Sequence, residues 1–272
     1  MKAIEQYQNT INEFIAANKF SKFPQELYEP LDYIMALGGK RMRPVMVLMA
    51  CDLMNGKMED AVHAAMAIET FHNFTLIHDD IMDNAPVRRG KTTVHEKWNV
   101  NTAILSGDVM LIEAYALLMK YENDLLRSIL NIFNKSAIEV CEGQQWDVDF
   151  ETRTDVSIPE YLKMIQFKTA VLVAAAMKMG AIIAETSEEN ANLIYDFGLN
   201  LGLAFQLQDD YLDAFGDPEK FGKEVGGDIR QNKKTFLLLH ALEVATPEQR
   251  AKLDTLLASN GPDKVPQVLE LF

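Results

Sequence analysis

Two short clusters of aspartate carry the most direct chemical signal in the sequence. The first is DDIMD, from Asp79 to Asp83, and the second is DDYLD, from Asp209 to Asp213. Residues i and i+4 share one face of a helix, so each cluster presents two carboxylates together. Mg²⁺ binds one or two carboxylates together with water and phosphate oxygens. A single cluster would be interpreted as an exposed acidic patch, but two favour a magnesium site for a phosphorylated ligand.

Basic residues lie close to both clusters and would neutralise such a ligand. GGKRMRP offers Lys40, Arg41 and Arg43, and VRRG offers Arg88 and Arg89 soon after the first cluster. A later glycine-rich stretch adds three lysines after the second cluster, which are Lys223, Lys233 and Lys234. The alternative for Arg88 and Arg89 is a charge pair at a helix C-terminus, and for GGKRMRP an ordinary surface turn. A basic segment beside each acidic cluster favours an anion site.

Composition limits the classes of function that the chain can have. The 26 basic and 40 acidic side chains give a formal net charge of −14, which opposes binding to nucleic acid or to an anionic membrane. Two distant cysteines and no CxxC motif argue against a disulfide scaffold or a zinc site, and they fit a reducing cytoplasm. The longest apolar stretch, 169–184, contains Lys178 and is too short to span a membrane, so we expect a soluble protein with no transmembrane segment.

Apolar residues recur with a helical period through most of the chain, for example over 61–77, 103–118 and 125–140. Alternation typical of strands is nearly absent. No change in composition divides the 272 residues, so we predict one all-α domain covering residues 1–272, with about ten or more helices. The aspartate clusters would lie near the ends of apolar helices, where an unpaired carboxylate is costly unless a cation neutralises it.

Six motifs, taken in order, resemble the trans-isoprenyl diphosphate synthases, also called polyprenyl synthetases. They are GGKRMRP, DDIMD followed by RRG, GQQWD at 143–147, FKTA at 167–170, FQLQDDYLD and GKEVGGD, and the resemblance covers about residues 31–235. It implies a bundle of mostly antiparallel helices around a central cavity, which is the isoprenoid synthase fold, and a homodimer. It also implies a prenyltransferase that joins isopentenyl diphosphate to an allylic diphosphate, which would be dimethylallyl, geranyl or farnesyl diphosphate.

The resemblance assigns expected roles to individual residues. Isopentenyl diphosphate would bind Lys40, Arg43, His72 and Arg89. The allylic diphosphate would bind Arg88, Lys168, Thr169, Gln206, Lys223 and Lys233, of which Arg88, Lys168, Thr169 and Gln206 would act in catalysis. Mg²⁺ would bind Asp79, Asp83 and Asp209, supported by Asp80, Asp210 and Asp213, with about three ions per active site. Taken alone, His72 would be a core histidine and Lys168 a structural lysine.

The expected reaction is ionisation of the allylic diphosphate, attack by the double bond of isopentenyl diphosphate and loss of a proton, for which no protein base is assigned. Product length would depend on Phe71, Phe74 and Thr75, which lie one to two turns before Asp79. An aromatic residue at Phe74 goes with short products in this family, of fifteen or twenty carbons. DDIMD lacks the two-residue insertion typical of bacterial farnesyl diphosphate synthases and Thr75 is not a second aromatic residue, so the resemblance favours geranylgeranyl diphosphate over farnesyl diphosphate. The alternative is that Phe71 and Phe74 are ordinary core residues.

Two features depart from the family pattern. Asn232 stands where a glycine usually precedes the last diphosphate lysine, and members generally continue for tens of residues beyond the position of Phe272. The resemblance therefore allows that C-terminal helices are missing from this sequence. The two alternative functions are a class I terpene cyclase and a non-catalytic regulatory subunit. The second DDxxD argues against the first, and the full set of aspartates and arginines argues against the second.

Overall fold

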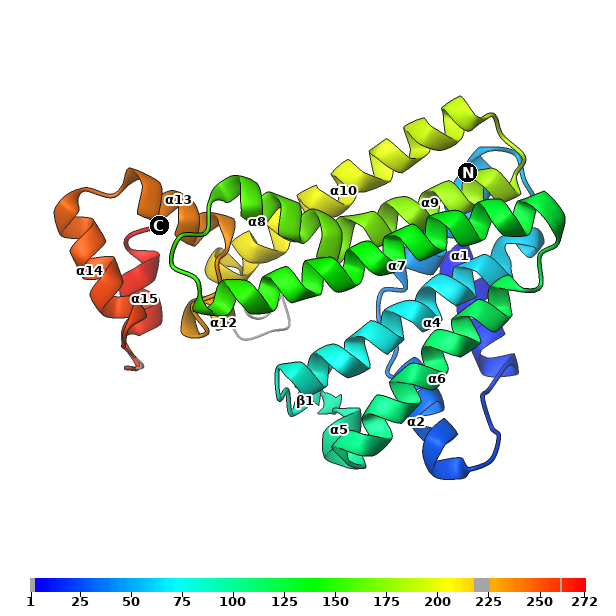
Figure 1. The fold of residues 1–272 in the computed structure, drawn as a ribbon, viewed down its shortest axis with the longest axis horizontal. Helices are drawn as coiled ribbons and strands as arrows, with labels where there is room; N and C mark the ends of the chain where they lie inside the picture. Colours follow the sequence, from blue (N-terminus) through cyan, green and yellow to red (C-terminus); the bar gives the residue numbers. More distant parts are fainter. Residues whose placement is uncertain (1–2, 218–225, 260) are drawn as a thin grey trace. The chain divides into compact units, whose positions relative to one another are not determined.

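Helices make up almost all of the regular structure, and the prediction of an all-α protein is confirmed (Figure 1). The computed structural model describes residues 3–217, 226–259 and 261–272. Its elements in chain order are α1 Ile4–Ala17, α2 Gln25–Ala36, α3 Met42–Leu53, α4 Met58–Met82, β1 Val87–Arg88, β2 Lys91–Thr92, α5 Val94–Lys97, α6 Val100–Leu118, α7 Asn123–Thr152, α8 Ile158–Ile165, the π-helix η1 Gln166–Ala170, α9 Val171–Ile183, α10 Glu188–Phe215, α12 Gly227–Arg230, α13 Phe236–Val244, α14 Pro247–Leu257 and α15 Lys264–Leu269.

The helices form two compact units. The first unit comprises Met1–Asn134 and Val173–Asp196, and the second comprises Lys135–Leu172 and Phe197–Phe272. The long helices α7 and α10 contribute residues to both units. Each aspartate cluster belongs to a different unit, the first to α4 and the second to α10. That residues 1–272 form a single domain stays a prediction.

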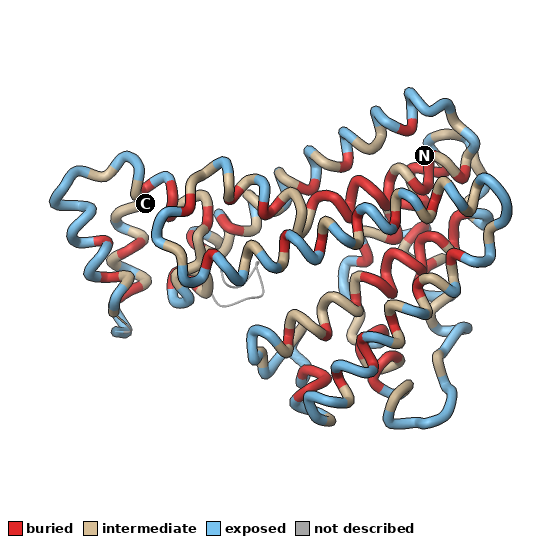
Figure 2. Tube along the Cα trace, in the orientation of Figure 1, coloured by how far each residue is buried: buried red, intermediate tan, exposed pale blue. Residues whose placement is uncertain are grey.

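The first unit is built around α4, which packs against α3 and α6 (Figure 1). Buried residues are dense along α4 (Figure 2), where Ala61, Ala64, Ala65 and Ile68 are all inaccessible. Small side chains let neighbouring helices approach α4 closely and leave little apolar surface in water. The final turns of α4 therefore continue a well-packed helix, and this packing fixes the backbone position of Asp79 and Asp83.

A tight hairpin follows α4 and contains Arg88 and Arg89. Strands β1 and β2 pair in antiparallel register, with Val87 opposite Thr92 and Arg88 opposite Lys91. The two turn residues, Arg89 and Gly90, have positive φ angles of 52° and 72°. Positive φ at both central residues is typical of the type I′ turn that closes two-residue hairpins. Arg88 and Arg89 thus lie in a hairpin just after α4, and Arg88 pairs with Asp79 and Asp80 in the last turns of that helix.

The second unit has its own apolar cluster, which includes Phe150, Tyr161, Ile165 and Leu239. Helix α8 begins with a capping box in which the side chains of Ser157 and Glu160 satisfy each other's backbone N–H groups. Helix α8 then continues into the π-helix η1. The short helices α12 to α15 contribute to a separate cluster further along the chain.

Two helical stretches of the described residues, Val100–Leu118 and Ile158–Ile183, are long and apolar enough to cross a membrane by length and composition alone. The second is 67% buried within the protein, as a core helix would be. Two such stretches are weak grounds for a membrane span, because core helices of soluble proteins pass the same test. The first stretch, helix α6, is 28% buried within the protein.

Candidate active site

The first aspartate cluster is held in place by Arg88. Asp80 is 1% exposed, and Arg88 Nε donates a hydrogen bond of 2.7 Å to its Oδ1. The Nη2 atom of the same guanidinium lies 3.2 Å from Asp79 Oδ2. Burial raises the pKa of Asp80, while Arg88 opposes that rise. Asp80 is therefore a structural carboxylate, whereas Asp79 and the exposed Asp83 are the members of the cluster that reach the surface.

A cationic cluster lies on the same unit, around His72. Arg43 Nη1 is 3.1 Å from His72 Nε2. Burial lowers the pKa of His72 well below its ordinary value, and the neighbouring Arg43, Arg89, Arg88 and Arg41 lower it further. His72 is thus neutral at physiological pH, and the arginines around it create a positive field suited to an anion. The buried Nε of Arg43 has no hydrogen-bond partner within the described part of the chain.

The glycine pair of GGKRMRP makes room for Arg89. A Cβ atom on Gly39 would lie 2.8 Å from Arg89 Cζ, and Gly39 has a φ of 125°. Arg89 Nη1 also donates a hydrogen bond to the carbonyl of Gly38. Lys40 is exposed, and its carbonyl accepts a hydrogen bond from Gln8 of α1. The structure therefore brings Arg43 and His72 into contact and places Arg89 against the residues that precede Lys40.

Arg41 is one of the three cations that GGKRMRP offers to an anion, but its guanidinium is paired inside the protein. The Arg41 side chain is 6% exposed, and its Nη1 lies 2.5 Å from Glu69 Oε1 on α4. A left-handed backbone conformation at Arg41, with φ of 50°, precedes α3. Glu69 is itself 2% exposed, and a buried carboxylate needs a cation. The sequence does contain a sign of this pairing, because Glu69 is a charged residue within the apolar run 61–77 and would need a buried cation as its partner.

In the second unit, hydrogen bonds connect the FKTA motif to the second aspartate cluster. Thr169 Oγ1 donates to Gln206 Oε1 at 3.2 Å, and Gln206 Nε2 donates to Asp210 Oδ1 at 2.9 Å. Tyr161, which is 2% exposed, donates to the other Asp210 oxygen at 2.5 Å. Asp210 is thus the counterpart of Asp80, a buried carboxylate held by protein groups. Sequence reasoning did not identify Tyr161, because 49 residues separate it from Asp210.

Lys168 lies on the π-helix, a distortion that often marks functional sites. Its ammonium is 2.5 Å from Asp147 Oδ2, the last residue of the GQQWD motif. A Cβ on Gly143 would lie 2.2 Å from the Lys168 backbone nitrogen, and one on Gly202 would lie 2.6 Å from Ala170 Cα. Both positions therefore exclude any larger residue. This close packing on η1 explains two glycines whose function was not apparent from the sequence.

The segment after α10 provides a further carboxylate, Asp228, at the start of α12. Asp213 Oδ2 accepts a hydrogen bond of 3.0 Å from the backbone N–H of Asp228, so Asp213 also has a structural role. Burial, with a contribution from Asp213, raises the pKa of Asp228 to about 6. Lys233 Nζ lies 4.0 Å from Asp228 Oδ1. Sequence reasoning quoted the GKEVGGD motif but gave Asp228 no role.

Lys223 and Lys233 were both predicted to bind the allylic diphosphate. Lys223 lies outside the described residues. Asn232 precedes Lys233 with a φ of 56°, and its side-chain amide donates to the carbonyl of Leu257. Asparagine is among the few non-glycine residues that adopt this left-handed conformation readily. The replacement of the usual glycine by Asn232 therefore preserves the turn that leads to Lys233.

The donor set of both clusters fits Mg²⁺, which prefers oxygen ligands and takes few of them from protein. Among the described residues, no three histidine, cysteine or acidic side chains are grouped so that they alone could hold a metal. Water and phosphate oxygens would thus have to complete the shell. Arg88 pairs with the buried Asp80, and Tyr161 and Gln206 donate hydrogen bonds to the buried Asp210, whereas Asp80 Oδ2 has no hydrogen-bond partner among the described residues.

Two aromatic side chains, Phe71 and Phe74, lie on α4 in the two turns before the first aspartate cluster. Phe71 is 1% exposed and contacts Phe133 with a ring-centroid distance of 5.3 Å. Phe74 lies 5.5 Å from Phe71 and 4.8 Å from His78 by the same measure, and it is only partly buried. The hydroxyl of Thr75 donates a hydrogen bond to the carbonyl of His72. Phe71 is thus a core residue, and Phe74 is the aromatic side chain that remains accessible.

Comparison with known proteins decides the family. Residues 24–272 match the family described as polyprenyl synthetase. The chain belongs to the polyprenyl synthetase family. It is 42% identical over 222 residues to a geranylgeranyl diphosphate synthase of Methanosarcina mazei, which covers 81% of this chain and 68% of that protein. It is 38% identical over 257 residues to a geranylfarnesyl diphosphate synthase of Natronomonas pharaonis, which covers 88% and 75% respectively.

A solved structure of a geranylgeranyl pyrophosphate synthase is similar to the whole chain, with a TM-score of 0.95 and 52% sequence identity. It covers 100% of this chain and 85% of that one. The family, the isoprenoid synthase fold and the prenyltransferase class predicted from the sequence are confirmed by these similarities. Membership of the polyprenyl synthetases also counts against a terpene cyclase. The roles of individual residues stay predictions.

Proposed function

We propose that the protein condenses isopentenyl diphosphate with an allylic diphosphate in a Mg²⁺-dependent reaction, with geranylgeranyl diphosphate as the product. One observation carries this proposal: α4 bears His72 within a cluster of arginines and, about two turns later, the aspartate Asp79. An anion site and a carboxylate site on one rigid helix suit two diphosphates that must react with each other. Holding reactants in a fixed geometry removes much of the entropic barrier.

The cationic cluster of the first unit would bind isopentenyl diphosphate. Arg43 and Arg89 would supply guanidinium donors, which match phosphate oxygens in pairs, and the exposed Lys40 would close on the ligand as a mobile charge. His72 is neutral, so one of its ring nitrogens would donate a hydrogen bond without adding charge. The unpartnered Nε of Arg43 supports this assignment.

The aspartates would hold Mg²⁺ for the allylic diphosphate, with Asp79, Asp83 and Asp209 as direct ligands and Asp80, Asp210 and Asp213 as supports. When bound, Mg²⁺ supplies the positive charge that stabilises the departing diphosphate. Asp80 and Asp210 would fix the helical backbone beneath those ligands through the hydrogen bonds already described. Burial supports this division for Asp80 and Asp210, and the hydrogen bond from the Asp228 N–H supports it for Asp213.

Other groups of the chain would neutralise and orient the allylic substrate. Lys168 and Lys233 would balance charge on the diphosphate, as would Lys223, and Arg88 would do so while it holds Asp80. Thr169 and Gln206, joined by a hydrogen bond, would place oxygen atoms near the electron-poor carbon. Apolar residues would exclude water, which would otherwise quench the reaction. No side chain is assigned as the base that removes the final proton.

Product length would depend on Phe74. A side chain that is partly accessible on α4, one turn before Asp79, is placed to limit an apolar chain growing along that helix. Phe71 would support it from the core through Phe133, and Thr75 would offer little obstruction because its hydroxyl is bonded to the backbone. A product of twenty carbons fits the likeness to geranylgeranyl diphosphate synthases, although a relative of similar identity makes geranylfarnesyl diphosphate.

A cytoplasmic homodimer is the expected state of the protein. Helix α6 exposes Leu105 and Ile112, and Met119 follows the helix as its C-cap residue; these side chains are 57%, 65% and 62% exposed. Their spacing of seven residues places them on one side of the helix. Exposed apolar side chains grouped in this way are typical of an interface between copies. Sedimentation that gave only a 30.7 kDa species would contradict the dimer.

The function is tested with purified protein, Mg²⁺, isopentenyl diphosphate and dimethylallyl, geranyl or farnesyl diphosphate, with products separated by chromatography. The expected result is elongation that stops mainly at geranylgeranyl diphosphate. No elongation of any allylic substrate would contradict the proposal and favour the regulatory subunit.

A further inference from the structure

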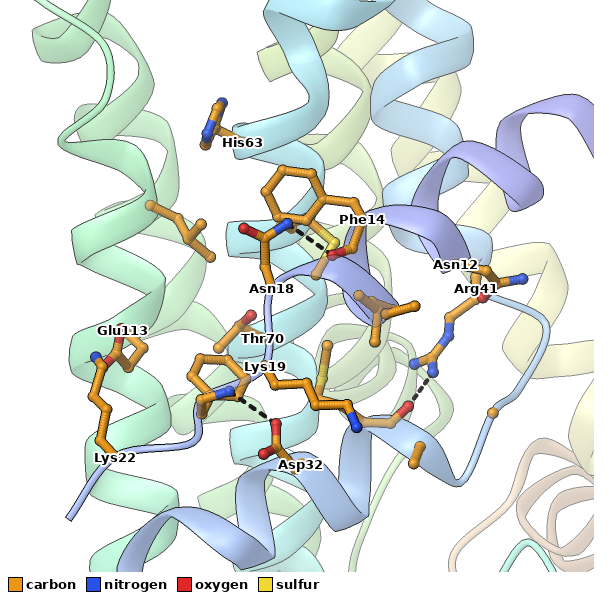
Figure 3. Close-up of a pocket in the computed structure, with 18 of the residues that line it drawn as sticks. Asn12, Phe14, Asn18, Lys19, Lys22, Asp32, Arg41, His63, Thr70 and Glu113 are labelled. Atoms are coloured by element: carbon orange, nitrogen blue, oxygen red, sulfur yellow. Dashed lines mark hydrogen bonds and ion pairs between the residues drawn. The ribbon is translucent and has the colours of Figure 1, made fainter.

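A cavity of about 630 Å³ lies in the first unit, away from the residues assigned to the reaction (Figure 3). Its walls come from α1, the segment between α1 and α2, α2, α4 and α6. Helix α4 contributes His63, Met66 and Thr70. At 100° per residue, Thr70 and His72 are separated by about 200° around α4, so the cavity and the cationic cluster are on opposite faces of one helix. The volume is within the range of small-molecule sites.

The interior of this cavity is largely apolar. Apolar lining residues come from every wall, and they include Phe14, Ile15, Met35, Met66 and Leu117. Met35 and Met66 are almost fully buried, and unbranched methionine side chains adapt readily to a ligand. An interior of this composition suits a hydrocarbon chain more than a polar metabolite.

The charged residues of the cavity wall leave an excess of positive charge. The two acidic residues are engaged, since Asp32 accepts hydrogen bonds from Phe20 N–H at 2.9 Å and from Ser21, and Glu113 pairs with Lys22 at 2.5 Å. Lys19 and Lys120 also belong to the wall, and the described residues provide no ion pair for either. An apolar interior beside two such lysines suits an amphiphile with an anionic head group.

A second observation points to a ligand in the same place. Thr70 lines the cavity and is 0% exposed, and its hydroxyl has no hydrogen-bond partner within the described part of the chain. Arg41 also lines the cavity, and its buried Nε has no partner in the same set of residues. Buried polar atoms are nearly always satisfied, so two unsatisfied ones in one cavity wall require an explanation. Neither atom is accessible to water in the structure, so a ligand head group would reach them only after a small movement of the cavity wall.

The cavity shares its wall with the segment that serves the proposed isopentenyl diphosphate site. Gly38 and Arg41 line it, and Gly38 accepts the hydrogen bond from Arg89. Arg41 in turn ties this segment to Glu69 on α4. A ligand that displaced Gly38 or Arg41 would therefore move Arg89 and change the affinity for isopentenyl diphosphate. The coupling would run through packed side chains and one helix.

We propose that this cavity is a regulatory site for a single-chain amphiphile with an anionic head, and that its occupancy weakens the binding of isopentenyl diphosphate. The regulatory part rests on the proposed function. Two sources share this chemistry, a prenyl diphosphate product and a fatty acid. Binding of a product would make the site a feedback device, whereas binding of a fatty acid would make the enzyme responsive to lipid supply.

The test measures binding and activity separately on the full chain. Calorimetry with palmitate, and with geranylgeranyl diphosphate in the presence of EDTA, reports binding under conditions that disfavour the metal-dependent site. In the double variant Lys19→Glu and Lys120→Glu, affinity should fall by about tenfold or more. The variant Ala36→Trp, which fills the cavity from an exposed small residue, should abolish binding. Lys57→Glu, at an exposed site outside the cavity, is the matched control.

Steady-state kinetics then tests the regulation. The bound ligand should raise the KM for isopentenyl diphosphate in the wild type and not in Ala36→Trp, whose activity without ligand should be unchanged. If both palmitate and geranylgeranyl diphosphate saturate the cavity, it is a general site for anionic amphiphiles. If only geranylgeranyl diphosphate does so, the ligand of the site is the product of the enzyme. Absence of binding by either probe, or equal affinity in the wild type and the charge-reversed variant, would overturn the proposal. Failure of elongation without ligand would instead refute the proposed function and leave the binding result standing.

Discussion

The phenolic oxygen of Tyr161 donates a hydrogen bond of 2.5 Å to the carboxylate of Asp210. Both side chains are buried, and Asp210 accepts its second hydrogen bond from Gln206. The buried carboxylate therefore fixes one turn of α10 beside Asp209. The corresponding arrangement in the first cluster is Asp80 with Arg88. In both clusters, a buried aspartate is thus held by protein groups beside a more accessible aspartate, Asp79 or Asp209.

Tyr161→Phe should reduce both stability and activity, because it leaves one oxygen of a buried carboxylate without a donor. An unsatisfied buried group costs about 1–3 kcal/mol, so the free energy of unfolding in urea should fall by that amount. The turnover number should fall while the KM for isopentenyl diphosphate changes little. Tyr115→Phe, which removes a hydroxyl bonded to Asn134 at 2.6 Å, is the control. Unchanged turnover in Tyr161→Phe would show that Tyr161 does not position the cluster.

Gly39→Ala should weaken the binding of isopentenyl diphosphate by displacing Arg89. Its Cβ would lie 2.8 Å from Arg89 Cζ, a contact that no real Cβ makes without movement. Loss of one charge-assisted contact of about 1.5–3 kcal/mol should raise the KM by roughly tenfold or more. Gly38→Ala is a matched control, since Gly38 also has positive φ but its Cβ would meet nothing within 4 Å. Equal effects of the two substitutions would assign both to backbone strain alone.

Phe74→Ala should shift the product distribution to longer chains, because it removes the accessible aromatic side chain one turn before Asp79. Chromatography of the products from farnesyl diphosphate would measure the shift. Phe23→Ala removes a phenyl ring that is 86% exposed and should leave the distribution unchanged. If the products of Phe74→Ala matched those of the wild type, Phe74 would not limit chain length.

His72 should make stability depend on pH. Its pKa in the folded state lies well below the unfolded value, so only the unfolded chain binds this proton as the pH falls below about 6.5. The free energy of unfolding therefore decreases in that range, by at most about 1.4 kcal/mol per pH unit for one group. Urea unfolding at pH 7.5 and pH 5.5 should show a smaller difference in His72→Gln than in the wild type. The exposed His240→Gln is the control, and an identical pH dependence in His72→Gln would contradict the account.

Local patterns in the sequence were sufficient for the fold class, and helical periodicity gave the long helices. GGKRMRP and RRG supplied the arginines that the structure places near His72, whereas a site role for His72 itself followed only from the family resemblance. Contacts between distant residues were not predictable in the same way. The orientation of Arg41 depends on a left-handed backbone and on Glu69, and the role of Tyr161 depends on how α8 packs against α10. Such pairings arise from tertiary packing, which overrides the local signal.

The dependence of elongation on Mg²⁺ in aspartate variants tests the central claim most directly. Asp79→Asn and Asp209→Asn should each raise the Mg²⁺ concentration needed for half-maximal activity and lower the turnover number by about a hundredfold or more, because each removes a proposed ligand. Asp155→Asn, at a side chain that is 76% exposed, should do neither. Unchanged Mg²⁺ dependence and turnover in both Asp79→Asn and Asp209→Asn would contradict the account.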